Sequence, residues 1–243
     1  MMNLKQAGSK IAKFFSTAVP NEPKCQLPQR TVDYLKFTGN RISDVKTELR
    51  EETEKKYPAL AEMLTSLQGG ELIKSLVMIH KGVKGIELGT FTGYSALCMA
   101  EALPSHGELI AMEINQEFIE FAQPYWKRAG VDKKIKPALG DARDTLKKLL
   151  EDPANIESFD FAYMDADKER YSEYYEALLK LIRPKGIIII DNVLWEGKVY
   201  YDHFITEETE GVKAINRLIK NDPRLEHLNM IALDDGVSIA IKK

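Results

Sequence analysis

Short apolar runs alternate with segments of helical periodicity from residue 83 onward, and this alternation constrains the fold more than any other feature. Five runs of five or six mostly apolar residues read as strands, at 83–88, 108–112, 134–139, 159–164 and 186–190. The segments between them, at 94–103, 116–129, 142–150 and 171–182, read as helices. Because parallel strands need crossover connections, the pattern predicts a parallel sheet with helices on both faces.

The end of the chain departs from that alternation. A helical segment at 208–220 is followed by apolar runs at 228–233 and 237–241, separated by Asp234-Asp235-Gly236. An Asp-Gly pair between apolar runs is typical of a β-hairpin. The expected fold class is therefore α/β, with a seven-stranded, mostly parallel sheet and a C-terminal antiparallel hairpin. This pattern resembles the Rossmann-like sheet of class I methyltransferases. Because a fold does not by itself determine a function, the function must be argued from individual residues.

Length and composition indicate a single globular domain. The chain has 243 residues, of which 44% are hydrophobic and 29% charged, and these values exclude a collagen, a disordered chain or a membrane-spanning protein. We expect the domain at 31–243, with a helical part at 31–80 and an α/β core at 83–243. The charge run at 48–56 is expected to be a solvated helix face, and 70–80 a further helix.

Residues 1–30 are predicted to form an amphipathic arm and a proline-rich linker. Apolar residues fall at helical spacing over 4–18, and three prolines follow within 20–28. The arm lacks the continuous apolar stretch of a secretory signal. Three roles stay open for it: packing or dimerisation, binding to a membrane surface or targeting, and a frayed terminus.

Charge and cysteine content disfavour two further classes. The 34 basic and 37 acidic residues give a net charge of −3, whereas nucleic-acid binding relies on a positive field. The two cysteines, Cys25 and Cys98, are too few for a disulfide framework, and Cys98 lies in an apolar run. We therefore expect a reducing, cytoplasmic location.

Carboxylates follow the predicted strands, at the sheet edge where α/β proteins bind ligands. The first strand leads into the glycine-bearing turn 89–95, and Glu113 follows the second strand, about where an acidic residue binds ribose hydroxyls. The turn lacks the third glycine of a dinucleotide fingerprint, and Glu87 would repel a pyrophosphate. S-adenosylmethionine, which is cationic and has no phosphate, fits this turn better than NAD. The alternative for Glu87 is a strand-end cap or a buried ion pair.

Asp165, Asp191 and Asn192 follow the fourth and fifth predicted strands. If those strands are neighbours, the three side chains converge, because adjacent strands lie roughly 5 Å apart. Carboxylate and amide oxygens without His or Cys suit Mg²⁺, with Ca²⁺ or Mn²⁺ as alternatives. Asx residues after strands also form ordinary turns, so a purely structural role stays open.

Three stretches of the chain carry a resemblance to a known family. They are Ile86-Glu87-Leu88-Gly89-Thr90-Phe91-Thr92-Gly93-Tyr94-Ser95, Met164-Asp165-Ala166-Asp167-Lys168-Glu169-Arg170-Tyr171 and Asp191-Asn192-Val193-Leu194-Trp195-Glu196-Gly197. With them the chain resembles the cation-dependent O-methyltransferases typified by caffeoyl-CoA and catechol O-methyltransferases, from about residue 64 to the C-terminus. The resemblance implies a homodimer and leaves the role of the first sixty residues open.

The resemblance also implies roles for individual residues. Around the methionine part of the cofactor it places Glu87, Gly89, Phe91 and Ser95. It assigns the ribose to Glu113 and a backbone contact with adenine to Ala142.

For the reaction itself, the resemblance implies Asp165, Asp191 and Asn192 as ligands of the divalent cation, with Asp165 also near the cofactor. Lys168 matches the lysine proposed as general base. Its alternative role is an ion pair that orients Asp165 or Asp167.

These observations predict an enzyme that transfers a methyl group to a hydroxyl of a vicinal-diol small molecule, of catechol or caffeoyl type. Two alternatives stay open, a tRNA hydroxyuridine O-methyltransferase of the same family and a non-catalytic cofactor-binding protein. Aromatic residues beyond the metal pair are expected either to stack on an aromatic acceptor or to form an ordinary surface loop. They are Trp195, Tyr200, Tyr201 and His203. The tyrosines of the 171–182 helix are expected to pack or to shape the substrate entrance.

Overall fold

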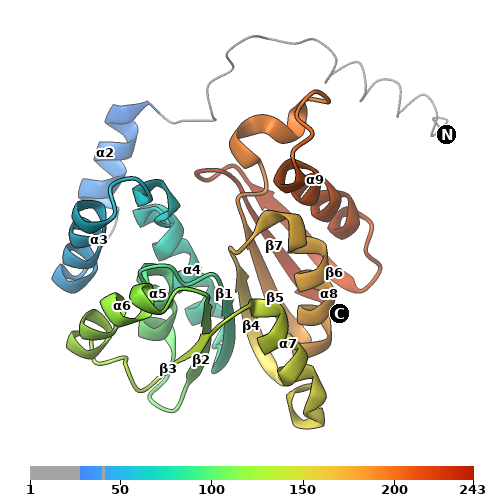
Figure 1. Ribbon diagram of the computed structural model, residues 1–243, viewed down its shortest axis with the longest axis horizontal. Coiled ribbons are helices and arrows are strands. Elements are labelled where there is room, and N and C mark those ends of the chain that lie inside the picture. Colours follow the sequence, from blue (N-terminus) through green and yellow to red (C-terminus); the bar gives the residue numbers. More distant parts are fainter. Residues whose placement is uncertain (1–27, 40–41) are drawn as a thin grey trace.

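The computed structural model describes residues 28–39 and 42–243 (Figure 1). The predicted arm helix, most of the proline-rich linker and Cys25 lie outside these residues. The described helices are α2 (Gln29–Thr38), α3 (Asp44–Lys56), α4 (Leu67–His80), α5 (Tyr94–Ala102), α6 (Gln116–Arg128), α7 (Ala142–Glu151), α8 (Tyr171–Leu181) and α9 (Glu207–Lys220). Short 3-10 helices are η1 (Ala61–Met63), η2 (Pro153–Asn155), η3 (Lys168–Arg170) and η4 (Trp195–Tyr200).

The strands form one sheet of seven, and the predicted fold class is confirmed. They are β1 (Lys84–Leu88), β2 (Glu108–Glu113), β3 (Ile135–Leu139), β4 (Phe159–Met164), β5 (Ile182–Asp191), β6 (Leu225–Ile231) and β7 (Val237–Lys242). Their order is β3-β2-β1-β4-β5-β7-β6. The first five strands pair in parallel, and β7 is antiparallel to both β5 and β6. The strand order reverses between β1 and β4, which is where an open α/β sheet forms its ligand crevice.

Helices cover both faces of the sheet, as predicted. Figure 1 shows α4, α5 and α6 on one side and α7 and α8 on the other. One buried cluster joins α3–α6 to the sheet through residues such as Leu49, Leu97 and Trp126. A second cluster joins α7–α9 to the opposite face, and Tyr171, Tyr174 and Tyr175 of α8 are buried in it. Of the two roles expected for these tyrosines, packing and shaping the substrate entrance, they therefore have the first.

Element boundaries differ from the predicted ones where pairing or capping overrides apolar content. The strand expected at 228–233 runs from Leu225 to Ile231, because Leu225 already pairs with β7. The strand expected at 186–190 begins at Ile182, which pairs with Phe159 before a register shift. The helix expected at 70–80 begins at Leu67, since the Ser66 hydroxyl accepts a hydrogen bond from the backbone N–H of Gly69.

Of two expectations for the N-terminal part, one needs correction and the other is confirmed. Helix α2 begins at Gln29, within the segment 1–30 that was expected to be arm and linker. The charge run lies on α3, where Glu51, Glu54, Lys55 and Lys56 are exposed, as expected for a solvated face, while Leu49 and Thr53 are buried. Just before the run, Lys46 is fully buried, and its ammonium forms ion pairs with Glu71 and Glu101.

Helix α9 approaches the turn η3 so closely that only glycine fits at position 211. A Cβ atom on Gly211 would lie 2.3 Å from the backbone oxygen of Lys168 and 2.6 Å from Cα of Glu169. Real Cβ atoms essentially never come within 3.0 Å of another heavy atom, so α9 or η3 would have to move.

We expect Gly211→Ala to lower the free energy of unfolding by about 1–3 kcal/mol, as overpacking of a tight contact does. An alanine in an unobstructed helix interior would instead raise it by up to about 1 kcal/mol. Urea denaturation measures the sign. The matched control is Ala214→Gly on the exposed face of α9, which should cost about 1 kcal/mol; a stabilised Gly211→Ala variant would show that the contact is not tight.

Candidate active site

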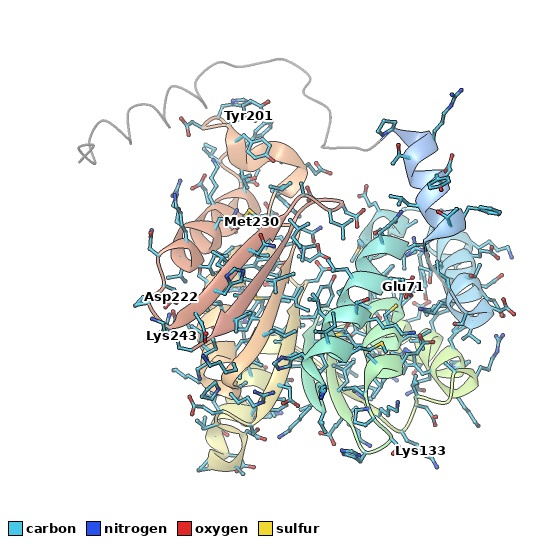
Figure 2. All side chains as sticks on the ribbon, turned by 180° about the vertical axis from the view of Figure 1, so that it is seen from behind. Glu71, Lys133, Tyr201, Asp222, Met230 and Lys243 are labelled. Carbon is cyan, nitrogen blue, oxygen red and sulfur yellow. The ribbon has the colours of Figure 1, made fainter. Side chains whose placement is uncertain are left out.

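A cavity of about 1100 Å³ opens at the carboxyl ends of the central strands. Its wall includes nine of the ten site residues predicted from the sequence: Gly89, Phe91, Ser95, Glu113, Ala142, Asp165, Lys168, Asp191 and Asn192. Figure 2 shows Tyr201, in the segment between β5 and α9, at the end of the molecule opposite Lys133, which precedes β3. The predicted residues therefore converge on one cavity at the expected edge of the sheet.

The turn after β1 brings the backbone close to β4. Gly89 has a φ of +85°, and a Cβ atom there would lie 2.2 Å from the backbone oxygen of Asp165. Gly93 has a φ of +83°, and its Cβ would meet Trp126 at 2.6 Å. The two glycines of the turn thus allow a left-handed backbone conformation and close packing, and they bring the start of α5 to the cavity.

Glu87 is the predicted site residue that does not line the cavity. Its carboxyl group is fully buried beneath the turn and accepts hydrogen bonds from the hydroxyls of Ser95, at 2.5 Å, and Thr90, at 2.9 Å. Burial raises the pKa of Glu87 to about 8. In this structure Glu87 supports the turn from below, and Ser95 lies between it and the cavity.

Glu113 and Ala142 stand at the ends of the second and third strands. The carboxylate of Glu113 accepts hydrogen bonds from the backbone N–H groups of Phe91, at 2.7 Å, and Asn115, at 2.9 Å. These bonds orient the carboxylate and leave lone pairs for a ligand hydroxyl. Ala142 is the first residue of α7, after the N-cap residue Asp141, so the backbone at the start of α7 borders the cavity.

Asp165 and Asp191 follow β4 and β5, which are parallel neighbours with Met164 opposite Ile190. The expected convergence of these carboxylates is therefore present. Asp191 accepts hydrogen bonds from the Asn192 backbone N–H at 2.8 Å and from the Tyr163 hydroxyl. Burial and the charge of Asp165 together raise the pKa of Asp191 to about 7.

This donor set fits a hard divalent cation. Both carboxylates keep free lone pairs, Asn192 supplies an amide oxygen at the same strand end, and a cation would offset the repulsion between the two acids. Within residues 28–39 and 42–243, no cluster of three or more His, Cys, Asp or Glu residues is arranged to hold a metal. At this strand end the amide of Asn192 is the side chain available as a third ligand beside the two carboxylates.

Lys168 reaches the same strand ends from η3. Its Nζ lies 2.6 Å from Asp165 Oδ1 and donates to the Tyr171 hydroxyl at 2.7 Å. The side chain is 8% exposed and lines the cavity, with Nζ 5.8 Å from the centre of the Trp195 ring. Lys168 thus forms an ion pair and also borders the cavity. Geometry alone therefore leaves both predicted roles open, general base and ion-pair partner.

Only part of the aromatic segment after β5 borders the cavity. Of its four candidate residues, Trp195 lines the wall, whereas Tyr200, Tyr201 and His203 are not among the described lining residues. The His203 ring instead packs against the Phe204 ring, with 4.3 Å between their centroids. Of these four residues, Trp195 is therefore the one placed to stack on an acceptor in the cavity.

Sequence reasoning missed three residues that support the site. Tyr163 donates its hydroxyl to Asp191 from within β4. On α9, the ammonium of Lys213 donates to the backbone oxygens of Tyr201 and Phe204, both at 3.0 Å, and the Asn216 amide donates to Val193 at 2.7 Å. Position alternation along β4 could have placed Tyr163 near Asp191. No sequence signal points to the α9 residues, because their contacts are made only in the folded chain.

Comparison with known proteins agrees with this geometry. Residues 38–243 match the family model described as O-methyltransferase, a match that begins upstream of the residue 64 expected from the sequence. The chain is 39% identical to a flavonoid 3',5'-methyltransferase of Vitis vinifera, over 79% of this chain and 83% of that protein. It is 38% identical to the catechol O-methyltransferase domain-containing protein 1 of Mus musculus, over 74% and 68%.

Solved structures extend the likeness to the whole fold. An O-methyltransferase from Bacillus cereus in complex with SAH matches with a TM-score of 0.79 and 26% identity, covering 88% of this chain and 97% of that one. The O-methyltransferase TomG from Streptomyces achromogenes, in complex with SAM, matches with a TM-score of 0.80 and 25% identity, covering 90% and 100%.

One further finding concerns membranes: within the described ranges 28–39 and 42–243, every helix is too short or too polar to cross a bilayer. The fold, the cavity at the reversal of strand order and the relatives converge on one class of enzyme. The chain belongs to the O-methyltransferase family and is an S-adenosylmethionine-dependent O-methyltransferase.

Proposed function

We propose that this enzyme depends on a divalent metal and methylates one hydroxyl of a vicinal diol on an aromatic small molecule. The observation that carries the proposal is the meeting of Asp165, Asp191 and Asn192 in the same cavity as the β1 turn and Lys168. A vicinal diol offers two adjacent oxygens, which suits a hard cation held by only three protein side chains.

In this proposal the β1 side of the cavity holds the methyl donor. Gly89, Phe91 and Ser95 surround its methionine part, and Glu87 acts through Ser95. Glu113 binds the ribose hydroxyls, and the backbone of Ala142 contacts adenine. The donor supplies a methyl group already activated on a sulfonium, so the protein mainly has to position the acceptor oxygen.

On the β4–β5 side, Asp165, Asp191 and Asn192 hold the cation, with Mg²⁺ as the first candidate and Ca²⁺ or Mn²⁺ as others. A bound cation supplies Lewis acidity that lowers the pKa of a substrate hydroxyl. Tyr163 holds the Asp191 carboxylate in place through its hydroxyl. Asp165 is one of the proposed cation ligands and also pairs with Lys168, so it connects the two functions.

Lys168 is the proposed general base. When uncharged, its Nζ accepts the proton of the substrate hydroxyl, and the resulting oxygen anion attacks the methyl carbon. The carbon–sulfur bond breaks, and its electron pair stays on sulfur. Tyr171 and Asp165 orient the lysine through the contacts at 2.7 and 2.6 Å. If Lys168 serves only as an ion-pair partner, an arginine at this position should keep the enzyme active.

Assembly and location stay predictions, namely a homodimer in the cytoplasm. Helix α2 offers a possible contact surface, since Tyr34 is 66% exposed and Phe37 90% exposed.

Metal removal tests the proposal most directly. Dialysis against EDTA should reduce methyl transfer to a catechol to background, and Mg²⁺ should restore it. Asp191→Asn should lower kcat/KM by about 100-fold or more, because loss of the Lewis acid costs several kcal/mol of transition-state stabilisation. Asp167→Asn, which changes a cavity carboxylate outside the proposed ligand set, is the matched control. Full turnover in EDTA would refute the metal dependence.

Replacement of Lys168 separates its two roles. We expect Lys168→Met to lower kcat by about 10²–10⁴-fold, the range for a general base, with little change in the Kd of S-adenosylmethionine measured by calorimetry. Lys168→Arg keeps a cation beside Asp165 but cannot accept the proton, so it should be similarly inactive. An active arginine variant would assign Lys168 to the ion pair instead.

Buried Glu87 should make stability depend on pH. Its pKa is about 8 in the folded chain against an ordinary value of 4.5. At pH values between these two pKa values, Glu87 keeps its proton in the folded chain and releases it in the unfolded chain. The free energy of unfolding therefore falls as pH rises through this window.

Glu87→Gln should therefore be more stable than the parent without cofactor at pH 8–9, by up to a few kcal/mol, and similar to it near pH 4.5. Denaturant titrations across pH measure the difference, and the exposed Glu151→Gln serves as the control. Parallel pH profiles for parent and Glu87→Gln would show that Glu87 is ionised in the folded chain.

A further inference from the structure

The wall of the cavity is strongly acidic. Its described lining residues include eleven carboxylates, namely Glu62, Glu113, Asp141, Asp165, Asp167, Glu169, Asp191, Glu196, Glu208, Asp234 and Asp235. Among those same residues the basic side chain is Lys168, and its ammonium is already paired with Asp165 at 2.6 Å. The wall thus offers an incoming anion no uncommitted cation from the described part of the chain.

Three basic residues beside the cavity are committed as well. Arg143 binds Asp141 at 2.5 Å, Arg170 lies 3.4 Å from Asp167, and Lys198 lies 2.8 Å from Glu196. Each of these cations already has a carboxylate partner. With Lys168 they make four cations against the eleven carboxylates, so acidic groups remain in excess.

The carboxylates divide between two sides of the cavity. Glu113, Asp165 and Asp191, at the ends of β2, β4 and β5, are the ones proposed to face the cofactor and the cation. A second group comes from η1, η4, the first turn of α9 and the turn between β6 and β7, on a side of the cavity that Trp195 and Met63 also line. Its members are Glu62, Glu196, Glu208, Asp234 and Asp235. In the proposed function the cofactor and the cation take the strand ends, so this second side faces the acceptor.

Several carboxylates on the acceptor side have no ion-pair partner among the residues that the structure describes. Glu62, Glu208 and Asp234 have no basic group within 4.0 Å among residues 28–39 and 42–243. The Asp234 carboxylate does accept a hydrogen bond from the Ser66 hydroxyl, which holds the β6–β7 turn against the start of α4. Like charges at the entrance raise the free energy of an anionic ligand there and slow its association.

We propose that the acceptor is a catechol without negative charge, and that the acidic entrance rejects catechol carboxylates and acyl-CoA thioesters. This inference rests on the proposed function and chooses between the two kinds of acceptor that it allows. The apolar side chains of Trp195 and Met63 suit an aromatic ring, whereas a coenzyme A moiety would bring several phosphate charges past Glu62 and Glu208. The same charges disfavour a polyanionic RNA acceptor.

A panel of acceptors with the same catechol ring and different charge tests the inference. The panel is 4-methylcatechol, dopamine, caffeate and caffeoyl-CoA, with Mg²⁺ and S-adenosylmethionine present. We expect kcat/KM for the neutral and cationic acceptors to exceed that for caffeate by about 10-fold or more, with caffeoyl-CoA lower still. The gap should narrow as ionic strength rises from about 0.01 to 0.3 M, because salt screens exposed charges. Preferred methylation of caffeoyl-CoA or of tRNA would overturn the inference.

Charge removal at the entrance provides a second test. The double variant Glu62→Gln/Glu208→Gln should raise the ratio of kcat/KM for caffeate over 4-methylcatechol several-fold. The matched control, Asp132→Asn/Glu151→Gln, removes two exposed charges far from the cavity and should leave that ratio unchanged; Asp132 adjoins Lys133 at the opposite end of the molecule (Figure 2). Equal shifts in both variants would show that net charge, and not the entrance, sets selectivity.

Binding measurements distinguish failure of this inference from failure of the proposed function. Titration of the four acceptors into protein loaded with Mg²⁺ and S-adenosylhomocysteine reports affinity without turnover. If no acceptor is methylated but affinity still falls with negative charge, the proposed function is wrong and the charge selection stands. If all four are methylated and bound alike, the proposed function stands and the charge selection is wrong.

Discussion

The contact between the β1 turn and the end of β4 is the constraint on which the site depends. The backbone N–H of Asp165 donates to Leu88 at 2.9 Å, and Gly89 lies so close that a side chain would meet the Asp165 backbone oxygen. The order of the strands reverses here, so the helices after β1 and β4 lie on opposite faces and leave the crevice open. One contact thereby joins the cofactor turn to the proposed cation ligands.

Helix α9 is a second scaffold, and it acts on the acceptor side. Gly211 lets it approach Lys168, Lys213 holds the carbonyls of the aromatic segment, and Asn216 holds Val193, which directly follows Asn192. These contacts come from one rigid element, so the turn that carries Lys168, the proposed general base, and the wall that includes Trp195 are positioned together. Neither strand order nor the β1 turn would position this half of the cavity.

Prediction from sequence worked best where local chemistry and topology coincide. Asp165 and Asp191 were expected to meet because each follows an apolar strand and adjacent parallel strands end at the same edge. Glu87 was assigned to the cofactor by motif, but its position inside β1 places it beneath the turn, one hydroxyl away from the cavity. Strand boundaries near Leu225 and Ile182 shifted because pairing partners, not apolar content, decide where a strand begins.

By itself, the sequence determined the α/β class, the antiparallel hairpin, the family and the set of carboxylates at the strand ends, because periodicity and short motifs record local preferences. Only the tertiary structure decided which further side chains support the cavity. Tyr163 reaches Asp191 and Lys213 reaches Tyr201 through contacts that no motif encodes. The acidity of the acceptor entrance likewise arises where η1, the β6–β7 turn and α9 come together. Charges distant along the chain add in one place only after folding, since electrostatic energy depends on separation in space.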